Sequence, residues 1–164
     1  MSIKEVGYIS KQELIDAKQD ISDARYAKGA VAVVECVQQI PCNPCETACK
    51  FDAITVGDPI TNLPKINEDN CTGCGACVAK CPGLAIFIVN KAFSETEATV
   101  AFPYEYKPTP EVGEEWEAVN RKGEVQCKCI IEKVMNSKAY DRTPVVTVKI
   151  PKEFADEVRS VKRK

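Results

Sequence analysis

Hydrophobic residues follow two patterns along this chain, one continuous and one alternating. Short continuous apolar runs occur at "AVAVVE" (residues 30–35) and "LAIFIV" (residues 84–89), and both are rich in β-branched residues. Such runs are typical of buried strands, so we expect these two to pair across the segment between them. A shorter pair, "AITV" and "LPKIN", flanks the turn-forming "GDPITN" and predicts a hairpin.

The alternating pattern dominates from residue 91 to the end. The runs "ATVAF", "EWEAV", "EVQCKCII" and "PVVTVKI" predict the strands of a small antiparallel sheet or partly closed barrel, and "PKEFADEVRSV" (residues 151–161) predicts a final helix. We therefore assign residues 91–164 to a small β domain with a C-terminal helix. A sheet of this size has little core of its own, so we expect this domain to dock a partner.

The N-terminal residues 1–29 predict a helical arm. Ser10 and Glu13 have the spacing of a capping box, and Leu14, Ala17 and Ile21 then recur at helical spacing until Gly29. We expect this arm to precede a domain that occupies residues 30–90.

The composition is that of a globular protein of one ordinary or two small domains. The chain has 164 residues, 45% of them hydrophobic and 28% charged, and its net charge of −2 gives no reason to expect nucleic acid as a partner. The start, "MSIKEVGYIS", lacks the pattern of a signal peptide, and residues 84–89 are too short to cross a bilayer. We expect a cytoplasmic protein without a transmembrane segment.

Ten cysteines and no histidine are the most distinctive feature of the composition. An even cysteine count can indicate disulfides, but that interpretation needs an exported chain. Metal binding is the better interpretation. The absence of histidine excludes Rieske ligation, mixed cysteine–histidine zinc sites and histidine-dependent acid–base catalysis.

Eight of the cysteines form two runs. The second run, "CTGCGACVAKCPG", has the spacing of bacterial 4Fe-4S ligation, including the proline after its last cysteine. The first run, "CVQQIPCNPCETACK", is a variant with five residues between its first two cysteines and Lys50 in place of the proline. Both "CKFDAITV" and "CPGLAIFIV" place Ala-Ile four and five residues after the last cysteine, which indicates an internal repeat.

In such a repeat the fourth cysteine of each run ligates the cluster of the other run. Two 4Fe-4S clusters are therefore predicted, each with four cysteine ligands. The ligands of cluster I are Cys36, Cys42, Cys45 and Cys81, and the ligands of cluster II are Cys71, Cys74, Cys77 and Cys49.

Two structural zinc sites with four thiolates each are the alternative that the spacing leaves open. Three cysteines at short intervals favour a cluster, as do Gly73 and Gly75, which allow a tight loop around it. Cys127 and Cys129 share one face of a predicted strand, and we interpret them as buried core thiols rather than ligands.

The residues beside the cysteines predict that the two clusters differ in reduction potential. Pro41 and Pro44 have no N–H group to donate to cluster I, and Glu35 and Glu46 add negative charge beside Cys36 and Cys45. Lys50 adds positive charge beside Cys49. Because N–H donors and cations stabilise the reduced form, we expect cluster I to have the lower potential.

Residues 30–90, with "AVVECVQQIPCNPCETAC" and "CTGCGACVAKCPGLAIF", resemble a two-cluster bacterial ferredoxin domain. More narrowly, they resemble the small iron–sulfur subunits of FAD-dependent dehydrogenases in anaerobic bacteria, which oxidise opines, proline, hydroxyproline or related amino acids. "FPYEYKPTPEVGEEWEAVNRKGEV" and "VVTVKIPKEFADEVR" are also similar to these subunits. The resemblance implies an α+β fold with a pseudo-twofold dicluster domain, and a hetero-oligomer in which the partner binds FAD.

No phosphate-binding glycine loop, P-loop or acid–base pair is evident, so we expect no flavin, nicotinamide or catalytic site on this chain. The predicted function is that of an electron-transfer subunit in an oxidoreductase complex. A freely diffusing ferredoxin and a zinc-stapled interaction module are the alternatives.

Overall fold

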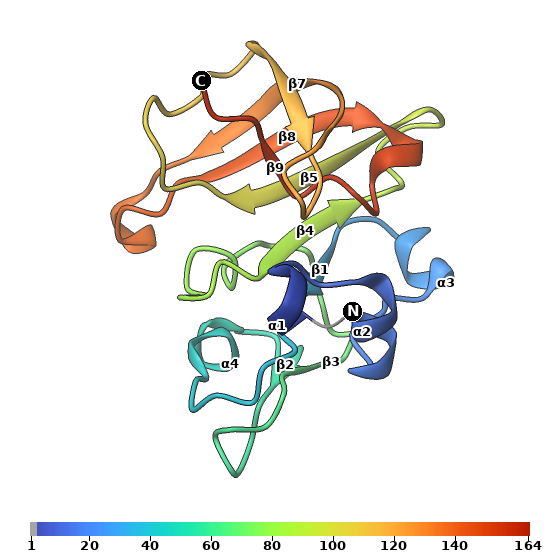
Figure 1. The fold of residues 1–164 in the computed structure, drawn as a ribbon. Helices are drawn as coiled ribbons and strands as arrows, with labels where there is room; N and C mark the ends of the chain where they lie inside the picture. Colours follow the sequence, from blue (N-terminus) through green and yellow to red (C-terminus); the bar gives the residue numbers. More distant parts are fainter. Residues whose placement is uncertain (1–2) are drawn as a thin grey trace.

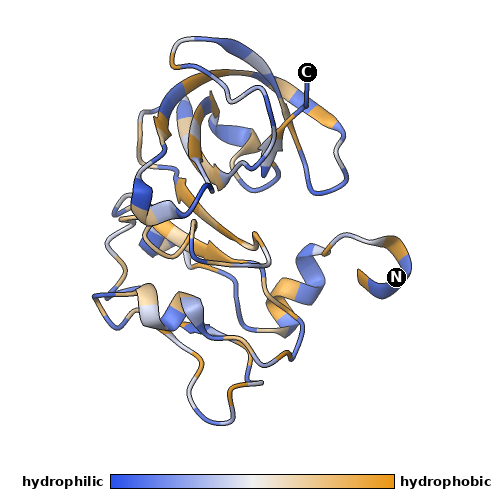
Figure 2. Ribbon diagram, turned by 90° about the vertical axis from the view of Figure 1, so that its left-hand side faces the viewer, coloured by the Kyte–Doolittle hydropathy of each residue, from blue (hydrophilic) through white to orange (hydrophobic). Residues whose placement is uncertain are grey.

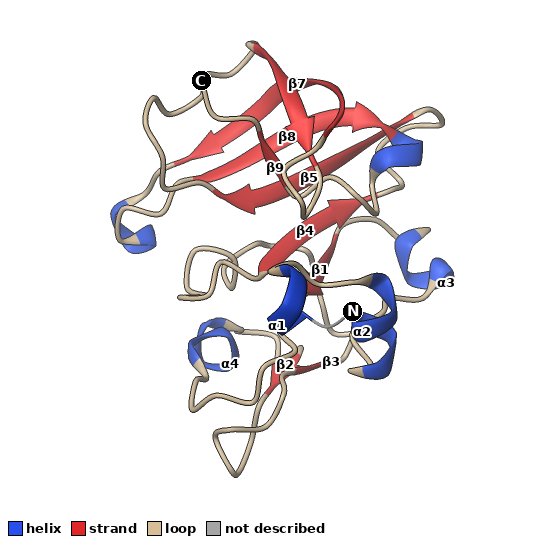
Figure 3. Ribbon diagram, viewed as in Figure 1, coloured by secondary structure: helices blue, strands red, loops and turns tan. Residues whose placement is uncertain are grey.

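Strands carry most of the regular structure of this protein, and its helices are short (Figure 3). The structure is a computed structural model that describes residues 3–164, so the first two residues of the expected N-terminal arm lie outside the described residues. Within the described range, seven strands form one antiparallel sheet in the order β1-β4-β5-β8-β7-β6-β9, and β2 and β3 form a second, two-stranded sheet. The fold is therefore mixed, with few helices and a mostly antiparallel sheet.

The strands of the large sheet are β1 Val31–Val34, β4 Ile86–Asn90, β5 Glu97–Pro103, β6 Glu115–Val119, β7 Val125–Met135, β8 Val145–Pro151 and β9 Ser160–Val161. The small sheet consists of β2 Ile54–Thr55 and β3 Lys65–Ile66. The α-helices are α1 Ile3–Val6, α2 Lys11–Asp16, α3 Asp23–Tyr26 and α4 Pro44–Ala48, and the 3₁₀ helices are η1 Lys138–Tyr140 and η2 Lys152–Phe154.

The two continuous apolar runs pair as predicted, with β1 antiparallel to β4 and Val31 opposite Val89. Both faces of this pair are buried, which explains why the runs do not alternate. On one face, Val33 lies in the main core, the buried cluster that also contains side chains of β5, β7 and β8. On the other face, Val34 packs against the cysteine loops. In Figure 1 the cysteine segment with α4, β2 and β3 lies below β1 and β4, and β5, β7 and β8 lie above.

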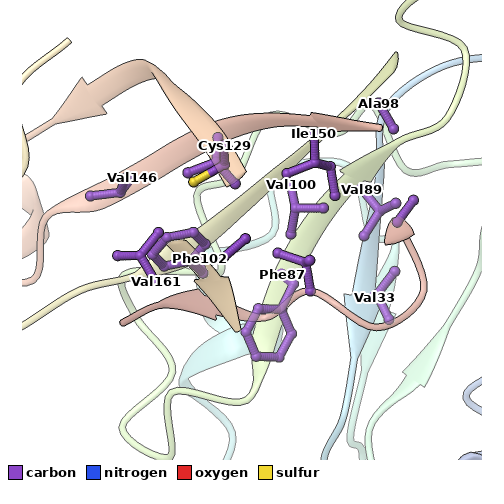
Figure 4. Close-up of a cluster of buried hydrophobic side chains, with 14 of the residues drawn as sticks. Val33, Phe87, Val89, Ala98, Val100, Phe102, Cys129, Val146, Ile150 and Val161 are labelled. Carbon is purple, nitrogen blue, oxygen red and sulfur yellow. The ribbon is translucent and has the colours of Figure 1, made fainter. Parts of the chain in front are cut away.

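The sheet continues through residue 90, because β4 pairs with β5 in the register Ile88 opposite Ala101. The hydrophobic core continues with it. Figure 4 shows Val33 and Val89 in one cluster with Val100 and Ile150. Full burial of an aliphatic side chain contributes about 1.5–3 kcal/mol. Residues 91–164 therefore share one hydrophobic core with the β1–β4 pair of residues 30–90.

The alternating segments form the strands predicted for them. In β6, Trp116 and Ala118 are buried while Glu115 and Glu117 are exposed. Figure 2 shows alternating hydrophobic and hydrophilic residues along the C-terminal strands of the large sheet, whereas β1 and residues 86–89 of β4 are continuously hydrophobic. This alternation arises because successive side chains of a strand point to opposite faces.

The helix predicted over residues 151–161 is wrong. Only η2 is helical there, and the chain then runs into β9, which pairs with β6. The Arg159 N–H donates to the carbonyl of Val119 (2.9 Å), and the Lys162 N–H donates to that of Glu117 (2.8 Å). Hydrogen bonds to the free edge of β6 replace those of a helix, and Val158 and Val161 still reach the core.

The N-terminal arm is helical only in pieces. The Ser10–Glu13 capping box is present at the start of α2, as predicted. The helix ends at Asp16 instead of continuing to Gly29, because Lys18 adopts a left-handed conformation (φ 56°). This bend directs Gln19 toward the first cysteine run, and Ile21 and Tyr26 into the main core.

Candidate metal centres

The chain adopts the same local geometry after the last cysteine of each run. Three residues after Cys49 and Cys81, Asp52 and Leu84 both have left-handed backbones, with φ of 51° and 53°. The next residue then donates its N–H to the cysteine sulfur, from Ala53 to Cys49 Sγ (3.3 Å) and from Ala85 to Cys81 Sγ (3.4 Å). The two turns thus have the same geometry although the left-handed residue differs, and both are followed by the Ala-Ile pair that the two runs share.

A first cavity lies under the β1–β4 pair and is lined by the buried side of Val34 and Ile86. The cysteines that line it are Cys36, Cys42, Cys45 and Cys81. Three of them come from the first run. Cys81 comes from the end of the second run, as the crossed arrangement requires.

A second cavity lies beside the first along the same strands, next to Ala32 and Ile88. The cysteines that line it are Cys49, Cys71, Cys74 and Cys77. Three of these belong to the second run, and Cys49 ends the first. The Ala32 N–H donates to Cys71 Sγ (3.3 Å), so β1 also supplies a backbone hydrogen bond to this sulfur.

Burial and neighbouring thiols raise the pKa of one cysteine deep in each cavity, Cys45 in the first and Cys77 in the second. Burial raises the pKa of Cys45 to about 11, and the nearby Cys81 and Cys42 add to the shift. Burial likewise raises the pKa of Cys77 to about 12, with contributions from Cys71 and Cys74. Thiolates gathered in this way need bound cations to balance their charge.

This donor set fits iron–sulfur clusters. Each cavity offers four sulfur ligands and no nitrogen ligand, and four cysteines are the ligands of a 4Fe-4S cluster. Between residues 3 and 164, no three histidine, cysteine, aspartate or glutamate side chains are grouped to hold a single metal ion.

Gly73 is essential to the tight loop of the second run. Its φ of 68° is left-handed, and a Cβ at this position would lie 2.6 Å from the carbonyl oxygen of Ala30. Gly75 also has positive φ (79°), but its Cβ would meet only Ile88 at 3.6 Å. The backbone of the second run therefore packs directly on the start of β1.

Two buried polar residues of the N-terminal arm hold the backbones of the cysteine loops. The Gln19 amide binds both backbone groups of Cys36, donating to its carbonyl (2.6 Å) and accepting from its N–H (3.1 Å). Arg25 donates to the carbonyls of Cys71 (2.6 Å) and Glu68 (2.7 Å). The sequence prediction missed both residues, because nothing in their spacing relates them to the cysteines.

Glu35 does not act as an unpaired negative charge beside Cys36, contrary to our expectation. Its carboxylate accepts hydrogen bonds from Arg159 Nε (2.7 Å) and Arg121 Nε (2.8 Å). Burial alone would raise the pKa of Glu35, but the Arg159 and Arg121 guanidinium groups lower it below its ordinary value. The charge argument that we based on Glu35 for a lower potential of cluster I therefore fails.

Cys127 and Cys129 lie on β7, in the large sheet, and line neither cavity. Cys129 is 2% exposed and packs in the main core opposite Trp116. Burial raises its pKa to about 12. Cys127 is only half-buried at the edge of this core, so the prediction of two buried thiols is correct for one of the pair.

The 4Fe-4S binding domain family Fer4 matches residues 64–87, which contain all four cysteines of the second run. This segment is a ferredoxin-type 4Fe-4S binding domain. The chain is thus an iron–sulfur protein. The first cysteine run lies outside the matched segment.

Several curated proteins are similar to part of the chain. A subunit of the Na(+)-translocating ferredoxin:NAD(+) oxidoreductase complex of Acetobacterium woodii is 45% identical over 48 residues, which are 29% of this chain and 14% of that protein. The polyferredoxin-like subunit of aliphatic sulfonate oxidoreductase from Pyrococcus furiosus is 48% identical over 48 residues, 29% of this chain and 27% of that protein. The ferredoxin-type protein NapF of Escherichia coli is 37% identical over 51 residues, 30% of this chain and 31% of that protein.

The chain thus spans less than a third of each of these relatives. No solved structure matches it. Among the helices between residues 3 and 164, none has the length and apolar character needed to span a bilayer.

Proposed function

We propose that this protein is an electron-transfer subunit that binds two 4Fe-4S clusters. Cluster I takes Cys36, Cys42, Cys45 and Cys81, and cluster II takes Cys71, Cys74, Cys77 and Cys49. The observation that carries the proposal is the pair of cavities, each lined by three cysteines of one run and the last cysteine of the other. A bound 4Fe-4S cluster takes up and releases one electron at a time.

The protein's own residues would hold and tune these clusters. The N–H groups of Ala32, Ala53 and Ala85 donate to cysteine sulfurs, and such hydrogen bonds stabilise the reduced state of a cluster. The apolar side chains of β1 and β4 cover the cavities from one side and keep water away. Both centres share this pair of strands, which suits transfer of an electron between them.

We further propose that the partner is an FAD-dependent dehydrogenase and that the two proteins form a hetero-oligomer in the cytoplasm. Relatives named as subunits of oxidoreductase complexes support an assembly of this kind. In residues 91–164, the proposed docking domain, Tyr106, Val112 and Val125 are large apolar side chains that are exposed. Exposed apolar side chains are common at protein interfaces. A reducing compartment would also keep the eight ligand thiols available.

Anaerobic purification with iron and sulfide analysis tests the cofactor proposal. Eight irons and eight acid-labile sulfides per chain are expected for two 4Fe-4S clusters. Cys45→Ser and Cys77→Ser are each expected to lose or alter one cluster. Cys129→Ser is the matched control, because it replaces a buried thiol that lines neither cavity, and it is expected to keep all the iron. A colourless protein that contains zinc and no sulfide would contradict the proposal.

Copurification from the native cell tests the partner. A flavoprotein that elutes with this chain and is reduced by an amino-acid substrate is expected. If the chain instead elutes alone near 18.0 kDa and exchanges electrons with several reductases, it is a freely diffusing ferredoxin.

A further inference from the structure

The N-terminal arm places one buried polar residue at each of the two cysteine loops. Gln19 is 1% exposed and Arg25 is 6% exposed, and neither belongs to the ferredoxin-type segment at residues 64–87. Both bind backbone atoms of the first cysteine in a run, Cys36 and Cys71.

We propose that residues 19–25 are a clamp that positions both cysteine loops, with Gln19 acting through Cys36 and Arg25 acting through Cys71. This inference rests on the proposed role of these cysteines as cluster ligands. Gln19 and Arg25 are positioning residues, because they touch the backbone of the ligand residues and not the metal-binding sulfurs.

Gln19 holds Cys36 in place at the start of the five-residue interval that separates it from Cys42. The residues from Gln38 to Pro41 are exposed, so this part of the loop has little packing to hold it. The Gln19 side chain forms hydrogen bonds with both the N–H and the carbonyl of Cys36, and its Nε2 also lies 3.4 Å from the Pro64 carbonyl. A buried amide that loses such partners is costly, so the arrangement resists displacement of Cys36.

Arg25 fixes the second loop against the start of β1. Its guanidinium donates to the carbonyls of Glu68, Gly29, Ala30 and Cys71. The Ala30 carbonyl is also the group on which Gly73 packs. Ser22 reinforces the attachment, because its N–H donates to the Glu68 carboxylate at 3.0 Å. The arm, β1 and the second cysteine loop are therefore held as one unit.

Arg25 places a buried positive charge behind the Cys71 loop. Within residues 3–164 its guanidinium is held by backbone carbonyls and forms no ion pair with a carboxylate, so its formal charge is not neutralised by a protein anion there. A cluster ligated by four thiolates is anionic and would lie against the Cys71 loop that Arg25 holds. A cation in this position stabilises the reduced cluster and raises its potential.

Release of iron to a chelator, measured anaerobically on the full-length holoprotein, tests the clamp. Gln19→Leu and Arg25→Gln are each expected to accelerate release of half of the iron by about tenfold, because each removes buried hydrogen bonds at one loop. Gln12→Leu and Lys28→Gln are the matched controls in the same arm, since both residues are exposed, and they are expected to release iron at the wild-type rate. Wild-type rates in both clamp variants would overturn the proposal.

A redox titration followed by electron paramagnetic resonance separates the charge of Arg25 from its hydrogen bonds. Arg25→Gln is expected to lower the midpoint potential of one cluster, and Arg25→Lys is expected to restore it while still releasing iron quickly. Lys28→Gln removes an exposed, screened charge and should leave both potentials unchanged. An unchanged potential in Arg25→Gln would refute the charge effect. If that variant does not fold, a wild-type release rate in Arg25→Lys would refute the clamp at Cys71.

Hydrogen exchange distinguishes failure of the clamp from failure of the cofactor assignment. The Cys36 N–H donates to Gln19 Oε1, so its exchange is expected to be faster in Gln19→Leu whichever metal the chain holds. Equal exchange in wild type and variant would overturn the clamp. Faster exchange in a protein without iron would support the clamp and contradict only the assignment of its metal.

Discussion

Arg159 Nε lies 2.7 Å from Glu35 Oε1, joining the end of the chain to the residue before the first cysteine, 124 positions earlier. Arg121 binds the same carboxylate, and the side chain of Glu35 is only 4% exposed. This buried cluster of three charges links the cysteine loops to the C-terminal half of the sheet.

Glu35→Gln is expected to lower the free energy of unfolding by about 3 kcal/mol, because it leaves the buried guanidinium of Arg159 without a counter-charge. Arg121 would keep only the half-exposed Glu157, at 3.6 Å. Arg159→Met should cost less, since Arg121 still pairs with Glu35. Anaerobic urea denaturation measures both effects. Lys128→Met is the control, because it breaks the exposed Lys128–Glu115 pair (2.8 Å), and it should change stability little. A Glu35→Gln variant as stable as the control would contradict this prediction.

The same carboxylate predicts a stability loss in acid. The two arginines hold the pKa of Glu35 below its ordinary value of 4.5, so the unfolded chain takes up a proton at higher pH than the folded protein does. The stabilisation is complete above pH 4.5 and is lost as the pH falls toward the lower pKa of the folded state. The difference in unfolding temperature between wild type and Glu35→Gln should therefore narrow below that pH. If the difference in unfolding temperature stays constant as the pH falls, this prediction is wrong.

Gly73→Ala is expected to disrupt the second cysteine loop, because the new Cβ would lie 2.6 Å from the Ala30 backbone. Gly57→Ala is a matched control. Gly57 has nearly the same φ (69° against 68°), but nothing lies within 4 Å of its Cβ position. The control should show only the strain of a left-handed backbone, roughly 1–2 kcal/mol. The iron content should fall in Gly73→Ala and not in Gly57→Ala. Equal iron contents in the two variants would show that the second cysteine loop can shift away from the Ala30 backbone.

Truncation after Asn90 is expected to destabilise the cysteine domain itself. The cut removes β5, the partner of β4, and exposes Phe87 and Val89 on the side that faces the rest of the sheet. It also removes Arg121 and Arg159, which leaves Glu35 unpaired. The truncated chain should aggregate or lose iron when assayed for solubility and iron content. A soluble fragment with a full complement of iron would show that residues 30–90 fold alone.

Local patterns determined a large part of this protein. The cysteine spacing and the repeated Ala-Ile positions predict two crossed sets of four ligands, because ligand spacing and tight turns depend on residues close in sequence. The same two sets of cysteines line the two cavities, and their role as ligands stays a prediction. The alternating run "EWEAV" predicts β6 with its observed bounds, and the Ser10–Glu13 capping box predicts the start of α2. Each of these features depends on neighbours only a few residues away.

Tertiary structure decided the features that depend on distant partners. Residues 151–161 have a helical pattern, yet β9 forms there because the edge of β6 offers hydrogen bonds and the core accepts Val158 and Val161 on that path. Gln19, Arg25 and Arg159 look like ordinary polar residues in the sequence. They became buried partners of Cys36, Cys71 and Glu35 only when folding brought them together. Their electrostatic and hydrogen-bonding roles come from burial, which the sequence pattern around each residue does not encode.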